Sequence, residues 1–168
     1  IDLMTNANLT PWYLGINPRG LVPVIVDDGD VHIESNDILV YLEQKYPQPQ
    51  LMPPGQADQA AALLELENNL HLDLRALSFR FVFNPPGPPK GPDDLATYAK
   101  EGSGTVGGQK DSRVDIEIGF WETYAKEGIT DAVATQAAAN FRRVFGEIDA
   151  RLASRPYILG DTLSAVDI

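Results

Sequence analysis

The chain contains no cysteine among its 168 residues, which excludes disulfide bonds and thiolate metal ligands. Histidine is almost missing too, because only His32 and His71 occur, about 40 residues apart. A histidine-based metal centre needs several such ligands close together. We therefore expect no metal site, and the lack of cysteine favours a cytoplasmic protein.

Positive charge is scarce: 13 lysines and arginines stand against 24 acidic residues, giving a formal net charge of −11. So acidic a surface repels phosphate backbones, and nucleic acid is not an expected partner. No apolar run approaches the roughly 18 residues of a membrane span, so no membrane partner is expected. The first residues lack the basic and apolar stretches of a signal peptide.

The first third of the sequence combines strand and helix signals. A β-branched run at residues 22–26, an acidic Gly-containing reversal at 27–30 and a return at 31–33 predict a β-hairpin. Ser35 is predicted to be the N-cap of a helix that ends at Pro47. A Pro-rich linker at 49–55 then separates a domain at 1–48 from one at 56–168.

Everything after the linker lacks strand patterning and is predicted to be helix or loop. Leucines at spacings of three and four predict one long amphipathic helix over 63–81. A second long helix is predicted from residue 131, with one apolar stripe made of Phe141, Phe145, Ile148 and Leu152. Two shorter helices, over 95–100 and 116–126, are predicted between them.

The letters GSGTVG at residues 102–107 match a dinucleotide-binding fingerprint. That motif binds a pyrophosphate only where it follows a strand and opens a helix. No hydrophobic strand precedes it here. We therefore predict a flexible loop without a nucleotide site.

Two local features near the hairpin each have an ordinary and a sharper interpretation. Pro23 belongs either to an edge strand with a trans bond or to a cis Val22–Pro23 bond that turns the Val22 backbone toward a ligand. Ser35, after Glu34, is either a plain N-cap or a hydroxyl that helps a helix N-terminus bind a carboxylate.

Taken together, three segments are recognisable: NPRGLVPVI at 17–25, ESNDI at 34–38 and RPYILGDTLSAVDI at 155–168. In this order, with helices between, they resemble the cytosolic glutathione S-transferase family. The resemblance implies an α+β fold, in which a thioredoxin-like domain, lacking its first strand and helix, precedes an all-helical domain that is incomplete at its end. In the last segment, Ser164 and Asp167 are spaced as a structural capping box.

The resemblance also implies roles for individual residues. The Val22 backbone, through a cis Pro23, would pair with the cysteinyl part of glutathione. Glu34 and Ser35 would hold its γ-glutamyl amine and carboxylate. The residue that activates the thiol is unknown and is expected before Ile1.

One position departs from the family pattern. Leu21 stands where many relatives carry Lys or Gln to bind the glycyl carboxylate of glutathione, and losing such a contact costs about 1–3 kcal/mol. Arg19 is a candidate for that task.

The residues between the two long helices are similar in layout to the bacterial β-etherase and reductive dehalogenase branch of the family. Three aromatic residues are candidates either for the wall of a pocket for a hydrophobic substrate or for core packing: Phe79, Phe83 and Tyr98.

The resemblance implies an enzyme that uses glutathione as co-substrate. Its thiolate would attack a small electrophile, aromatic or hydrophobic, in a cytoplasmic detoxification reaction without a metal. A homodimer is implied as well. Two alternatives stay open: a non-catalytic binding or scaffold protein of the same fold, and a glutathione-dependent β-aryl etherase or dehalogenase.

Overall fold

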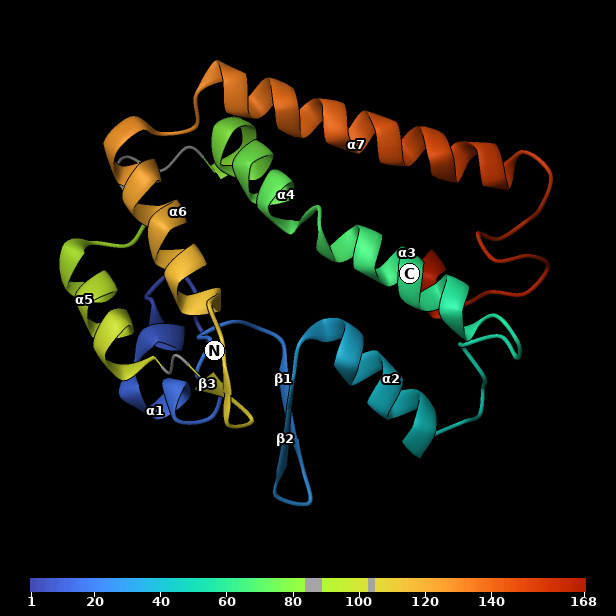
Figure 1. Cartoon of the computed structure of the whole chain (residues 1–168), viewed down its shortest axis with the longest axis horizontal. Helices are drawn as coiled ribbons and strands as arrows, with labels where there is room; N and C mark the ends of the chain where they lie inside the picture. The colour runs from blue at the N-terminus through green and yellow to red at the C-terminus, as the bar shows by residue number, and fades with distance from the viewer. Residues whose placement is uncertain (84–88, 103–104) are drawn as a thin grey trace. The chain divides into compact units, whose positions relative to one another are not determined.

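The computed structural model describes residues 1–83, 89–102 and 105–168 (Figure 1). Their contacts divide them into two compact units, one within residues 1–35 and 85–128 and the other within 36–84 and 129–168. The predicted domains at 1–48 and 56–168 follow the order of the chain, and their boundaries stay a prediction. Each compact unit combines two stretches that are far apart in sequence.

Short helices, two hairpins and two longer helices make up the first unit. Its elements are η1 (Ala7–Leu9), α1 (Pro11–Leu14), β1 (Val24–Asp27), β2 (Asp30–Ile33), α5 (Pro92–Glu101), β3 (Thr105–Val106), β4 (Gln109–Lys110) and α6 (Arg113–Glu127).

The second unit is helical. Its elements are α2 (Ser35–Lys45, whose first residue belongs to the first unit), α3 (Ala57–Asn68), α4 (His71–Ser78), the π-helical turn η2 (Phe79–Phe83), α7 (Asp131–Leu152) and η3 (Ala165–Asp167).

The core of the first unit forms where η1 and α1 meet α5 and α6. Its buried members are Leu9, Leu14, Tyr98 and Val114. Gly20 lies against this core with a φ of +63°, and a Cβ there would lie 3.1 Å from atoms of Leu9, Leu14 and Tyr98. Both the backbone conformation and the lack of space therefore require glycine.

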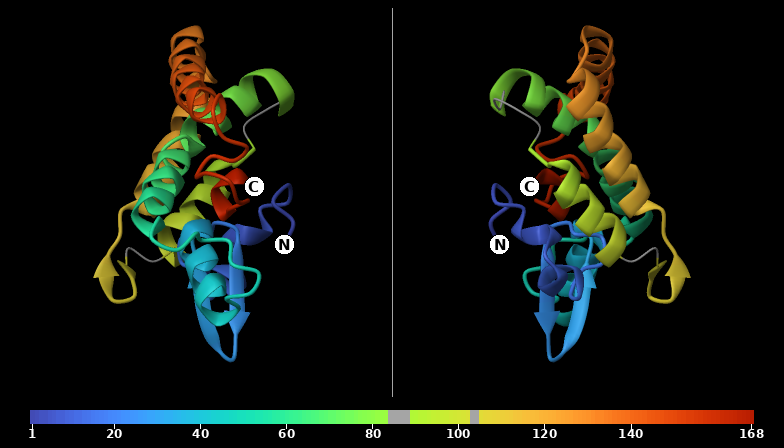
Figure 2. Two further views of the ribbon diagram at one scale, coloured as in Figure 1. Left: turned by 90° about the vertical axis from the view of Figure 1, so that its right-hand side faces the viewer. Right: turned by 90° about the vertical axis from the view of Figure 1, so that its left-hand side faces the viewer.

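The predicted hairpin over residues 22–33 is confirmed, and β1 and β2 lie side by side in every view (Figure 2). They pair antiparallel, with Val24 opposite Ile33 at the open end and Asp27 opposite Asp30 at the turn. An Asp-Gly pair makes the two-residue connection, which is a favoured sequence for such turns.

A second, shorter hairpin lies where a flexible loop was predicted. β3 pairs antiparallel with β4 through Gly107 and Gly108, which have φ values of 56° and 76°. Two successive positive φ angles suit a tight hairpin turn, so the glycines that suggested a loop serve a strand pair instead. Ser103 and Gly104 of the GSGTVG pattern lie outside the described residues. Of the rest, Gly102 follows the end of α5, and residues 105–107 form a strand and the start of a turn. This is no dinucleotide-binding arrangement.

The single long helix predicted over 63–81 is wrong, because the chain forms α3, α4 and η2 there. The break falls at Asn69 and Leu70. Asn69 donates from its side chain to the Glu65 carboxylate (3.3 Å), and the Leu70 amide bonds to the Glu67 carbonyl three residues back (2.9 Å). The bond from Leu70 spans three residues instead of four, which tightens the last turn and ends α3.

Helix α7 packs along α4 (Figure 1). The predicted stripe on α7 is partly wrong, since Phe145 and Leu152 are exposed by 60% and 40%. The buried α7 side chains are instead Ala134, Ala137 and Val144. Small side chains let neighbouring helices approach closely, and a periodicity based on large apolar residues overlooks them.

A hydrogen bond between side chains adds to this packing, because Asn140 on α7 donates to Asp73 on α4 at 2.8 Å. None of the helices in the described ranges combines the length and apolar character of a membrane span.

Candidate functional site

The segment before Pro23 is held by buried side chains that bind three successive carbonyls. Tyr98 donates its hydroxyl to the carbonyl of Arg19, and Asn8 donates its amide to that of Gly20 (2.6 Å). The carbonyl of Leu21 accepts two bonds, one from the hydroxyl of Tyr13 (2.7 Å) and one from the amide of Asn17 (2.8 Å). The backbone entering Val22 is therefore fixed from several directions.

The Val22–Pro23 peptide bond is cis, so the sharper interpretation of Pro23 is confirmed. Val22 is 44% exposed. Within the described residues, no hydrogen bond reaches the Val22 backbone, so its donor and acceptor are available to a ligand. A peptide laid beside Val22 would satisfy both groups.

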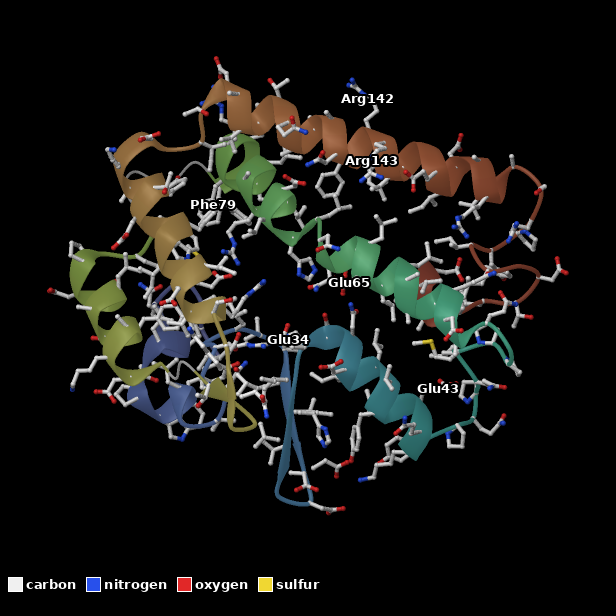
Figure 3. All side chains as sticks on the ribbon, in the orientation of Figure 1. Glu34, Glu43, Glu65, Phe79, Arg142 and Arg143 are labelled. Carbon is white, nitrogen blue, oxygen red and sulfur yellow. The ribbon has the colours of Figure 1, made fainter. Side chains whose placement is uncertain are left out.

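The hairpin register brings the predicted binding residues to one place. Because Val24 pairs with Ile33, Pro23 and Glu34 both lie at the open end of the β1–β2 hairpin. Figure 3 shows Glu34 where β2 gives way to α2. Ser35 is the first residue of α2 rather than the residue before it, so the predicted N-cap is displaced by one position.

Glu34 has an unusual backbone conformation and a strong partner. Its φ of 67° lies in the left-handed region, which costs a residue with a side chain about 1–2 kcal/mol. Its carboxylate pairs with the guanidinium of Arg19 at 2.7 Å. Strained residues of this kind cluster at functional sites, so Glu34 is a functional candidate on geometry as well as on sequence.

Arg19 lies between two carboxylates, since its Nε also bonds to Asp111 at 2.5 Å. Burial opposes its charge, but the hydrogen bonds with Asp111 and Glu34 outweigh burial and hold the pKa of Arg19 above its usual value. For Asp111, burial likewise favours the neutral form, but Arg19 and the amide of Arg113 bring its pKa below the ordinary value. Arg19 and Asp111 are therefore both charged at neutral pH.

These contacts bear on the roles considered for Arg19. Its guanidinium faces Glu34, on the side proposed for the γ-glutamyl end of a ligand, and is already paired twice. Leu21 offers no side-chain donor for a glycyl carboxylate. No group of three or more metal-ligating side chains occurs in the ranges that the structure describes.

The three aromatic candidates lie in different surroundings. Phe79 and Phe83 belong to η2, with ring centroids 5.4 Å apart, and Phe83 is 61% exposed. Tyr98 is 2% exposed and belongs to the core of the first unit. The position of Tyr98 thus fits the second of the two alternatives, core packing, better than a pocket wall.

At the end of the chain, the predicted contacts between Ser164 and Asp167 are present. Asp167 accepts bonds from the amide (2.9 Å) and the hydroxyl (2.6 Å) of Ser164, and a further one from the amide of Ile158 (2.7 Å). Burial alone would raise the pKa of Asp167, but these bonds lower it. The pair ties η3 to the loop before it, which is a structural role.

Sequence reasoning missed Asp111 and the bracing side chains Tyr13 and Asn17. Asp111 is 92 residues from Arg19, so no local spacing indicates their contact. Asn17 had a usable signal, because Asn before Pro is a turn signal and its side chain commonly bonds to nearby backbone.

Comparison of the sequence with known protein families identifies the family of this chain. The family model described as "Glutathione S-transferase, N-terminal domain" matches residues 2–50, and the one described as "Glutathione S-transferase, C-terminal domain" matches residues 131–168. Together they cover more than half of the chain. The chain belongs to the glutathione S-transferase family, and the predicted α+β fold, thioredoxin-like and then helical, is confirmed.

Individual relatives agree. A zeta-class glutathione S-transferase of Euphorbia esula is 34% identical over 100 residues, covering 60% of this chain and 44% of the relative. A maleylacetoacetate isomerase of Pseudomonas aeruginosa is 51% identical over 43 residues, covering 25% of this chain and 20% of the relative. The chain thus spans less than half the length of these two relatives.

Among solved structures, the beta-etherase LigF from Sphingobium sp. strain SYK-6 superimposes with a TM-score of 0.77. The match covers 99% of this chain and 66% of that one, at 16% sequence identity. At this identity the likeness concerns the fold.

Proposed function

We propose that the open end of the β1–β2 hairpin binds glutathione. The observation that carries this proposal is the Val22 backbone, which has no hydrogen-bond partner in the described residues. Val22 is 44% exposed as a residue and lies beside the hairpin end that leads into Glu34 and Ser35. All of these residues fall within the range matched by the N-terminal domain model. In this proposal the cysteinyl part of the tripeptide pairs with Val22, next to Pro23.

Glu34 and Ser35 are proposed to hold the γ-glutamyl end. A carboxylate suits the ammonium group of that end, and the first residue of a helix suits its carboxylate because helix N-termini carry partial positive charge. Arg19 is proposed to act here by holding Glu34, rather than by binding the glycyl carboxylate, because its guanidinium is already engaged.

The proposed reaction of the full-length protein is thiolate transfer. The glutathione thiol loses its proton, the sulfur forms a bond to an electrophilic carbon, and the leaving group departs with the electron pair of the broken bond. The residues named here fix the position of the tripeptide, which is the proximity part of catalysis. Phe79 and Phe83 are the aromatic side chains proposed to contact a hydrophobic or aromatic electrophile.

The wider setting is proposed from the family. We expect a cytoplasmic homodimer that acts in detoxification, with glutathione as co-substrate. The name of the LigF neighbour makes β-aryl ether cleavage a second reaction to test. A non-catalytic binding or scaffold protein is the third candidate, and Leu21 favours it because a donor is lacking at that position.

Binding and turnover of the full-length protein separate these candidates. Glu34→Gln should weaken glutathione binding at least tenfold by calorimetry, because a charge-assisted contact is worth about 1.5–3 kcal/mol. Glu122→Gln is the matched control, since Glu122 is an exposed α6 residue and makes the same charge change.

Turnover is then measured with an aryl halide and with a β-aryl ether. Binding without turnover of either substrate would favour the non-catalytic candidate. Equal binding by Glu34→Gln and wild type would refute the proposed site.

A further inference from the structure

Asp111 contacts Arg19 of the proposed glutathione site but is not itself proposed to contact glutathione. Its Oδ2 accepts from the Nε of Arg19, while its Oδ1 accepts from the amide of Arg113 at 3.0 Å. Asp111 is only 12% exposed. The carboxylate is therefore fixed at the start of α6 and holds the guanidinium from one side.

The other side of the guanidinium faces Glu34, through Nη1. A guanidinium is planar, and two donors that point in different directions fix its rotation. Tyr98 also holds the carbonyl of Arg19, so both the backbone and the side chain of this residue are anchored. The position of the Glu34 carboxylate consequently depends on Asp111 as well as on Arg19.

The two residues that hold Arg19 from outside the hairpin, Tyr98 and Asp111, come from a part of the chain that neither glutathione S-transferase family model matches. The models cover residues 2–50 and 131–168, whereas Tyr98 and Asp111 lie between these ranges. Arg19 and Glu34 lie inside the first range. Tyr98 and Asp111, outside the matched ranges, thus fix the position of Arg19, which pairs with Glu34 inside the first matched range.

The charges also favour one kind of ligand. Arg19 carries one positive charge, and Glu34 and Asp111 carry one negative charge each, so the group has a net charge of −1. Without Asp111, Arg19 would neutralise Glu34 and the group would have no net charge. An ammonium group beside Glu34 is attracted more strongly by the first arrangement than by the second.

We propose that Asp111 is a positioning residue that orients Arg19 on Glu34 and gives the site its selectivity for the free amine of the γ-glutamyl end. The inference rests on the proposed glutathione site. It assigns to Asp111 an effect on one end of the ligand only. A ligand that lacks the amine therefore loses no affinity when Asp111 is neutralised, because its remaining carboxylate is not attracted by the negative charge.

The test compares two ligands on the full-length protein by calorimetry: glutathione and its des-amino analogue, glutaryl-cysteinylglycine. Asp111→Asn should weaken glutathione binding about fivefold, the effect of a partly screened unit charge worth about 1 kcal/mol, and should not weaken binding of the analogue, whose carboxylate gains from the loss of a negative charge. Asp115→Asn is the matched control, because Asp115 is an exposed acid on the same helix. It should alter neither affinity.

The outcomes are distinguishable. Equal weakening of both ligands would make Asp111 a general support of the fold and overturn the proposal, as would unchanged glutathione binding. An equal effect of Asp115→Asn would show that net charge alone matters, which also overturns it. If wild type binds neither ligand, the glutathione site itself is refuted together with this inference.

Arg19→Lys provides a second variant if Asp111→Asn does not fold. A lysine keeps the charge but cannot reach both carboxylates with a planar pair of donors. The same loss of preference for glutathione over its analogue is expected. An unchanged preference would count against the proposal.

Discussion

Asn17 offers a strong test of how side chains fix the loop at residues 17–22, which precedes the cis Val22–Pro23 bond. Its side chain is fully buried and makes two bonds, donating to the carbonyl of Leu21 (2.8 Å) and accepting from the amide of Arg19 (3.0 Å). Asn17→Ala removes both bonds, each worth about 1 kcal/mol, and leaves the Arg19 amide without this acceptor at a further cost of about 1 kcal/mol. We expect the free energy of unfolding to fall by about 3 kcal/mol.

Tyr13→Phe is the matched comparison. It removes the hydroxyl bond to Leu21, whose carbonyl keeps the bond from Asn17. The expected cost is about 1 kcal/mol.

Urea unfolding followed by tryptophan fluorescence measures both variants. Trp12 and Trp121 are the only tryptophans of the chain, and both lie in the first unit, so the signal reports on the unit that contains the loop. If Tyr13→Phe proves as costly as Asn17→Ala, or if Asn17→Ala costs less than about 1 kcal/mol, the account of this loop is refuted.

Two further predictions follow from single residues. Gly20→Ala should lower the free energy of unfolding by about 1–3 kcal/mol in the same fluorescence assay, because its φ is +63° and the new methyl group would crowd Tyr98; a neutral effect would contradict the packing described. Asp167 has a lowered pKa in the folded state, so its contribution to stability is present above about pH 4 and is lost as the pH falls through the folded pKa. Thermal unfolding followed by circular dichroism should therefore show Asp167→Asn less stable than wild type at pH 7, with the difference shrinking below about pH 4; a constant difference across this range would contradict the assignment.

Local signals predicted the features that depend on neighbouring residues. The hairpin followed from a β-branched run, an acidic reversal that contains glycine and a returning run, and the contact between Ser164 and Asp167 followed from their spacing. The cis bond at Pro23 became the better interpretation only through the family resemblance, because isolated proline residues favour trans. These features involve stretches of a dozen residues or fewer.

Other features depend on contacts that the sequence order hides. Arg19 and Asp111 are brought together by the fold, and neither has a neighbour in sequence that indicates the other. The break at Asn69 was missed because the leucine spacing continues through it while the backbone does not. On α7 the buried residues are mostly alanines, so the apolar pattern pointed to larger side chains that are partly exposed.

Tyr98 has two structural roles, because its ring packs in the core of the first unit while its hydroxyl donates a hydrogen bond to the Arg19 carbonyl. One residue thus supports both the packing of this unit and the backbone before Pro23. Substitutions that loosen α5 should therefore also shift the backbone that we propose to face glutathione, even when they lie away from it. Under the proposed function, thermal stability and glutathione affinity should vary together among natural variants, because one side chain supports both.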